Sequence, residues 1–202
     1  MNITEETKDM LCELMNMGIG EASIALSETL NQYITLKVPE VLILTFDEML
    51  AFVNSHETKN YVHVIQKMHG TIKGLGVLSF PLENGKALVD TLLQNDAESE
   101  GDEFTSWEIE AIQEVGNMVI NSLGMAIADT TGIKIRYELP EIFFSENIYP
   151  VSKVPEQEED IFCFATTTFY VKNLDVLGCV NLVLTNKSVQ VISDKLIHSL
   201  KD

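Results

Sequence analysis

The sequence predicts an α/β (α+β) protein made of two similar halves, in which antiparallel β-strands are covered by two long helices. Two observations support this fold class. Two long helical patterns begin about 100 positions apart, and each is followed by strand-like runs that include a hairpin. We therefore expect one compact domain with a pseudo-twofold axis, divided into residues 1–101 and 102–202.

The first half opens with a helical pattern over residues 4–31. Asn2 and Glu5 have capping-box spacing at its start. Apolar and small residues recur along it at the spacing of one helix face: Leu11, Leu14, Met15, Gly18, Ala22, Ala25 and Leu26. Further along, strands are predicted at 33–38, 41–46, 60–68 and 71–80, and shorter helices at 47–55 and 84–94. The polar segment 95–103 is the predicted linker.

The second half repeats this order. A helix is predicted over 105–131, with a capping box formed by Thr105 and Glu108. Strands are predicted at 133–139 and 141–144 and in a hairpin within 160–185, followed by a closing helix at 187–200. Leu177-Gly178 repeats Leu75-Gly76 at an offset of 102, which supports an internal duplication.

Composition limits the function classes. The net charge of −18 disfavours nucleic acid and anionic membrane surfaces and favours partners with basic patches. No apolar run is long enough for a membrane span, and the acidic start lacks a signal-peptide pattern, so we expect a cytoplasmic protein. The three cysteines have no CxxC spacing and are interpreted as free thiols in a reducing compartment.

Each long helix carries a polar stripe opposite its apolar face, and the two stripes match. Their shared positions are Asp9, Glu13 and Asn16 in the first copy and Glu110, Glu114 and Asn117 in the second. Each asparagine is followed, after 22 intervening residues, by a proline: Pro39 and Pro140. Exposed helix faces are often rich in glutamate, and prolines interrupt strands, so a purely structural interpretation also exists. Asparagine in mid-helix has no such local reason, which favours a functional role for the Glu/Asn pairs.

A metal site is the other interpretation of the stripes. Asp9/Glu13 and Glu110/Glu114 are carboxylate pairs one helical turn apart, a spacing that could bind a hard cation. Neither stripe adds a histidine or a further carboxylate, and the four histidines lack metal-site spacing. We therefore predict no metal and no resident cofactor.

The two stripes resemble the signature of the CheC/CheX/FliY family of chemotaxis phosphatases, [DS]-x3-E-x2-N-x22-P. The resemblance spans the chain in two copies, and the length is most similar to CheC-type members. It implies an α/β pseudo-twofold fold and dephosphorylation of the chemotaxis response regulator CheY. Glu110 departs from the signature, which has Asp or Ser at this position.

The resemblance also implies roles for the side chains. An aspartyl phosphate needs a water molecule placed in line with phosphorus, and a carboxamide, Asn16 or Asn117, can hold that water. Glu13 or Glu114 would pair with the regulator's active-site lysine, and the regulator would bring its own Mg²⁺. The alternative function is a non-catalytic adaptor that binds CheD, a receptor-modifying deamidase, or phosphorylated CheY.

Overall fold

A single antiparallel sheet joins the strands of both halves in the structure, a computed structural model that describes residues 4–37, 39–55, 59–94, 103–150, 162–172 and 174–199. The strand order is β1-β7-β8-β4-β3-β5, with β2 also paired to β7 and β6 also paired to β3. The strands are β1 (Ile34–Leu36), β2 (Glu40–Leu44), β3 (Tyr61–His69), β4 (Gly74–Pro81), β5 (Arg136–Tyr137), β6 (Glu141–Ser145), β7 (Phe162–Val171) and β8 (Val176–Thr185). The predicted antiparallel α/β fold class is confirmed.

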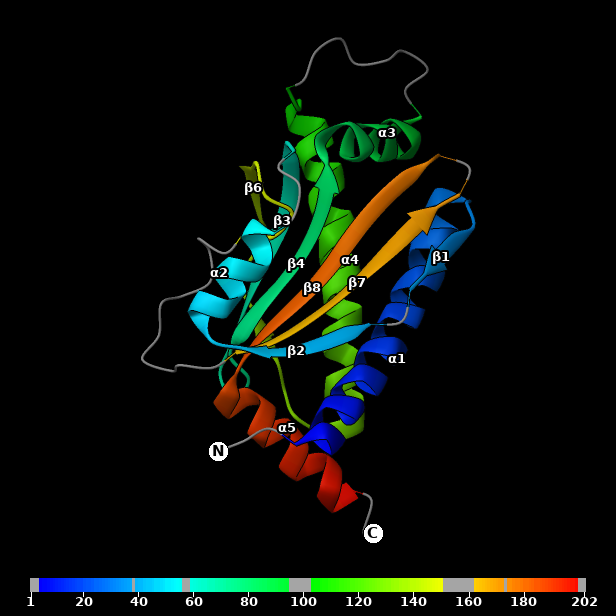
Figure 1. The fold of residues 1–202 in the computed structure, drawn as a ribbon. Coiled ribbons are helices and arrows are strands. Elements are labelled where there is room, and N and C mark those ends of the chain that lie inside the picture. The colour runs from blue at the N-terminus through cyan, green and yellow to red at the C-terminus, as the bar shows by residue number, and fades with distance from the viewer. Residues whose placement is uncertain are drawn as a thin grey trace.

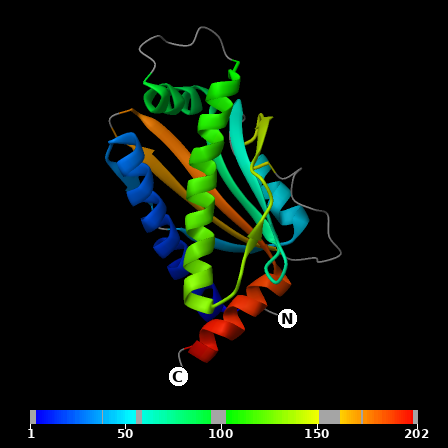
Figure 2. The same ribbon diagram turned by 180° about the vertical axis from the view of Figure 1, so that it is seen from behind.

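Helices cover both faces of this sheet. Figure 2 shows α4 lying across one face with α1 beside it, and Figure 1 shows α2 on the other face. Helices α3 and α5 lie at opposite ends of the sheet (Figure 1). The helices are α1 (Glu5–Leu30), α2 (Phe46–Asn54), α3 (Leu82–Leu93), α4 (Ser106–Thr131) and α5 (Asn186–Ser199). Within the described residues, no helix has the length and apolarity that crossing a membrane requires.

The centre of the sheet carries the internal symmetry. Strands β4 and β8 pair there, and Leu78 lies opposite Val180 in their register. These two residues are 102 positions apart, the same offset that relates Leu75 to Leu177. The pseudo-twofold axis therefore passes between Leu78 and Val180.

The outer strands cross between the halves. Strands β1 and β2 of the first half pair with β7 of the second, and β5 and β6 of the second half pair with β3 of the first. Helices α1 and α4, which carry the two signature copies and are called the signature helices, therefore each lead into strands that pair with the other half. The predicted boundary between residues 101 and 102 falls outside the described residues.

Several predicted element boundaries are wrong by a few residues. The strand predicted at 133–139 contains only the two residues of β5, because the regular pairing with β3 is interrupted after Tyr137 and resumes at Glu141 in β6. The helix predicted at 84–94 begins earlier, at Leu82. The capping box predicted at Asn2 is also wrong, since Thr4 is the N-cap of α1; Asn2 itself lies outside the described residues.

Two apolar clusters hold the layers together. The larger lies between the sheet and the pair α1 and α4, where Leu14 and Val119 are almost fully buried. The smaller lies under α2, which buries Met49 and Val53 against the opposite face of the sheet. All residues of the predicted apolar stripe of α1 are buried except Ala25, which is half-buried. Burial of one face leaves the polar stripe of each signature helix on the outside.

His63 lies buried in β3 and is hydrogen-bonded on both ring nitrogens. Its Nδ1 lies 2.8 Å from Ser79 Oγ, and its Nε2 lies 2.9 Å from Ser145 Oγ. Burial, partly offset by a hydrogen bond to the Asn147 backbone, lowers the pKa of His63 to about 4. His63 is therefore a neutral structural residue.

Acidification should destabilise the protein through His63. Between pH 6.5 and pH 4 the unfolded chain binds a proton that the folded chain does not. The contribution of His63 to the unfolding free energy is therefore fully present above this window and is lost as the pH falls through it. We expect His63 to account for a loss of about 2 kcal/mol in unfolding free energy between pH 7 and pH 5. Urea unfolding at both pH values measures this loss. His63→Gln should reduce the loss, whereas the same change at exposed His69 should leave it unchanged; equal losses in both variants would contradict the assignment.

Candidate functional site

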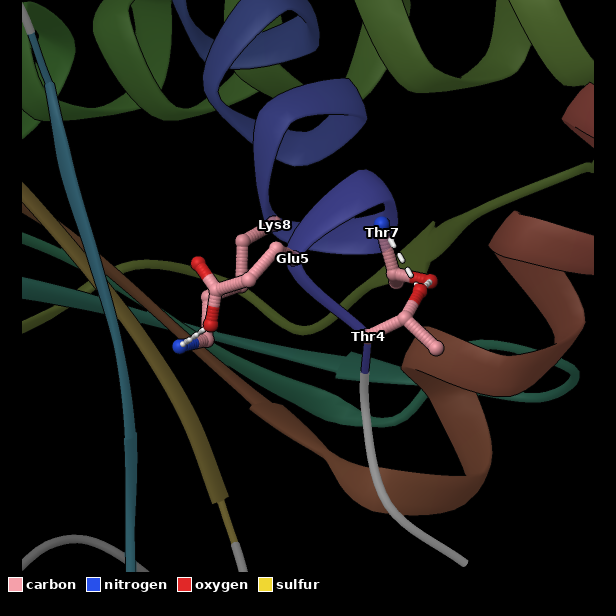
Figure 3. Close-up of polar contacts among 4 residues, drawn as sticks. All are labelled: Thr4, Glu5, Thr7 and Lys8. Carbon is pink, nitrogen blue, oxygen red and sulfur yellow. Dashed lines mark hydrogen bonds and ion pairs between the residues drawn. The ribbon is translucent and has the colours of Figure 1, made fainter.

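The first signature helix begins at a defined N-cap. The Thr7 N–H donates to Thr4 Oγ1 at 3.2 Å, and Lys8 Nζ pairs with Glu5 Oε1 at 2.7 Å (Figure 3). Thr7 Oγ1 also lies 3.3 Å from Ser193 Oγ of α5. These contacts fix where α1 starts.

The first polar stripe lies where the sequence predicts it. Asp9, Glu13 and Asn16 are all exposed, while Leu11 and Met15 on the opposite side are buried. No hydrogen bond between a described residue and the side chain of Glu13 or Asn16 is present. Both side chains are therefore open to a partner that approaches α1.

The second stripe differs in its burial. Glu110 and Glu114 are exposed, as predicted, but Asn117 and Asn121 are half-buried. Asn117 Oδ1 accepts two hydrogen bonds, one from Asn121 Nδ2 at 2.8 Å and one from Gln66 Nε2 at 3.2 Å. Gln66 belongs to β3 of the first half, so this site is assembled from both halves.

The two prolines occupy equivalent breaks in the outer strands. Pro39 lies between β1 and β2, and Pro140 lies between β5 and β6. The side chain before each signature glutamate donates to the proline carbonyl: Cys12 Sγ to Pro39 at 3.7 Å, and Gln113 Nε2 to Pro140 at 3.1 Å. These hydrogen bonds join each signature helix to the break in the strands that follow it, at the proline that the signature places after its asparagine and 22 intervening residues.

Gln66 is the residue of this site that the sequence did not reveal. In β3, Val62, Val64 and Met68 face the helical layer, and Gln66 occupies the same side of the strand. A buried amide in such an apolar alternation needs a hydrogen-bond partner, which was the signal available in the sequence. Its partner could not be identified, because Asn117 is 51 positions away in the other half.

Other reactive groups do not form a second centre. Cys163 and Cys179 are buried in the sheet, and burial raises the pKa of the Cys163 thiol to about 12. Burial, followed by the nearby Asp9 charge, also raises the pKa of Cys12. Neutral thiols are poor nucleophiles and poor metal ligands. Within the described ranges, no group of three or more His, Cys, Asp or Glu side chains could hold a metal ion.

Fold and site first define a class: α/β proteins in which two symmetry-related helices, packed on one antiparallel sheet, carry Glu/Asn pairs at equivalent positions. Residues 6–43, which contain the first signature copy, match the CheC-like family. The CheY-P phosphatase CheC of Bacillus subtilis (strain 168) is 28% identical over 164 residues, covering 76% of this chain and 77% of that protein.

Solved structures share this fold. FliY from Thermotoga maritima superimposes with a TM-score of 0.77 at 20% identity, covering 98% of this chain and 99% of that one. The FliM middle domain from H. pylori has a TM-score of 0.68 at 16% identity, covering 96% and 99%. The resemblance predicted from the signatures is confirmed: the chain is similar in sequence to CheC-like proteins and in fold to FliY.

Proposed function

We propose that this protein accelerates hydrolysis of the aspartyl phosphate of the response regulator CheY. The observation that carries the proposal is that both Glu/Asn pairs occur at equivalent positions of two long helices, with both glutamates and Asn16 exposed and Asn117 half-buried. The relative from Bacillus subtilis is named as a CheY-P phosphatase, which supports the same activity here. The acidic surface, with a net charge of −18, favours a partner whose docking face is basic.

The chemistry requires little from this chain. Water attacks phosphorus, the new P–O bond forms as the bond to the aspartyl oxygen breaks, the bonding electrons leave with the aspartate carboxylate, and the proton from the water passes to the released phosphate. Asn16 and Asn117 would each orient the water or a phosphoryl oxygen through their amides, and Glu13 and Glu114 would pair with the regulator's lysine. Mg²⁺ would belong to the regulator, where it offsets phosphoryl charge. Asp9 and Glu110 would border the contact.

The test is the decay of phosphorylated CheY, followed with and without this protein. Faster decay at substoichiometric protein supports a phosphatase. Binding of phosphorylated CheY or of CheD without faster decay would instead support the adaptor function. Titration calorimetry with each partner separates these outcomes, because it detects binding whether or not turnover follows.

The glutamates should act mainly on binding. Replacing Glu13 and Glu114 together by glutamine removes two charges but preserves side-chain length. We expect the KM for phosphorylated CheY to rise by about threefold to tenfold, with a smaller change in kcat, because a partly desolvated ion pair is lost. The salt dependence of kcat/KM should weaken as well.

A charge-matched control is available on α1. Glu21 and Glu28 are also exposed but lie off the polar stripe. Their double replacement by glutamine should leave KM close to that of the wild type. Equal effects in the two double variants would mean that only net charge matters and that the signature glutamates have no specific contact.

A further inference from the structure

We propose that Gln66 and Asn121 are positioning residues that hold Asn117 with its amide N–H groups directed outward. The second site is then preorganised and the first is not. This inference rests on the proposed function of Asn117. It concerns two side chains outside the signature, one of which comes from the opposite half of the chain.

The orientation of Gln66 is fixed by the backbone. Its Nε2 donates to the Glu138 carbonyl at 3.2 Å, and that peptide segment is itself held by the Glu138 N–H, which donates to the Lys67 carbonyl at 2.9 Å. A carbonyl can only accept, so the amino end of Gln66 must face it. Gln66 is 3% exposed, which leaves its side chain little freedom to turn.

The fixed Gln66 determines the orientation of Asn117. Gln66 Nε2 also faces Asn117, so Asn117 must present its oxygen there. One helical turn further, Asn121 Nδ2 donates to the same oxygen. The two hydrogen bonds occupy both lone pairs of Asn117 Oδ1. Its Nδ2 has no acceptor among the described residues, so Asn117 presents two N–H donors to a water or phosphoryl oxygen.

The first site lacks both supports. The Lys37 N–H donates to the Thr168 carbonyl, and this contact is the Glu138–Lys67 contact shifted by 101 positions. The same shift places Thr167 where Gln66 is, and Thr167 Oγ1 donates to the Lys37 carbonyl at 2.7 Å. The shorter threonine makes no described hydrogen bond to Asn16, and Gly20 replaces Asn121 without a side chain. Asn16 is therefore free to rotate.

The test uses proteins with one working site each. Gln66→Met keeps side-chain length but removes the donor. In the Asn16→Ala background, where only the second site remains, we expect Gln66→Met to lower kcat for phosphorylated CheY by about threefold to tenfold. KM should stay unchanged. In the Asn117→Ala background the same change should add no further loss. Asn121→Ala should behave in the same way.

Two kinetic results would overturn the inference. One is an unchanged kcat for Gln66→Met in the Asn16→Ala background. The other is an equal loss in both backgrounds, which would mean that Gln66 acts through the stability of the sheet. Absence of activity in the wild type would instead reject the proposed function.

A second measurement does not depend on activity. The side-chain amide signals of Asn16 and Asn117, assigned in ¹⁵N-labelled protein by their alanine variants, report mobility through the heteronuclear NOE. We expect Asn117 to be rigid and Asn16 mobile, and we expect Gln66→Met to make Asn117 mobile. Equal mobility of the two amides in the wild type would refute the positioning role even if CheY is not the substrate.

Discussion

The variant with aspartate in place of both Asn16 and Asn117 should lose nearly all acceleration of CheY dephosphorylation, by about a hundredfold or more. Aspartate has almost the same shape as asparagine, so the helices should be preserved. A carboxylate cannot donate a hydrogen bond, however, and it adds negative charge beside a phosphoryl group. The initial rate of phosphate release at saturating regulator measures the loss, and circular dichroism verifies the fold.

Single and control variants determine the origin of that loss. Asn16→Ala and Asn117→Ala show how much each site contributes, and loss only in the double variant would mean two working sites. Aspartate at Asn54 and Asn60, both exposed and outside the signature helices, adds the same charge elsewhere. Full activity of the Asn16/Asn117 aspartate variant would reject the role of these amides in catalysis.

The parts of the fold that sequence reasoning predicted are those encoded by local patterns. Helix α1 spans Glu5–Leu30 where 4–31 was expected, and the Thr105 capping box of α4 is present with both of its hydrogen bonds. Amphipathic periodicity and caps depend on residues within a few positions of each other, so they can be read along the chain.

Strand pairing between the halves could not be predicted in this way. The duplication predicted one compact domain with a pseudo-twofold axis, but it did not say that β1 and β2 pair with β7 rather than with β3. Alternation along a strand predicts which residues are buried, but it does not specify which strand lies alongside. The prolines Pro39 and Pro140 interrupt the outer strands, which makes these strands shorter still and weakens the pattern.

As with the fold, the sequence predicted the parts of the candidate site that depend on local patterns and not the contacts between the halves. The acidic and asparagine residues of each signature lie on one helix and could be found by spacing alone. The hydrogen bonds that distinguish Asn117 from Asn16 depend on strand β3, on a backbone carbonyl and on Asn121 together. Two sites that look nearly identical in sequence therefore differ in how firmly they hold the same amide.

The packing of α1 against α4 yields the second large expected effect. A Cβ atom on Gly18 would lie 2.7 Å from Leu123 Cα and 3.0 Å from the Ser122 carbonyl oxygen. Both are backbone atoms of α4, so the clash can be relieved only by moving the helices apart. We expect Gly18→Ala to lower the unfolding free energy by about 1–3 kcal/mol, despite the better helix propensity of alanine.

Gly20, on the same helix, provides the matched control. A Cβ atom there would meet nothing within 4 Å, so Gly20→Ala should stabilise the protein by about 0.5–1 kcal/mol. Urea unfolding of both variants at pH 7 measures the contrast, since helix propensity is the same in each and only the contact with α4 differs. If Gly18→Ala were as stable as Gly20→Ala, the close approach of the two helices would be wrong. The relative placement of the two Glu/Asn stripes depends on this close approach, so it would then be wrong as well.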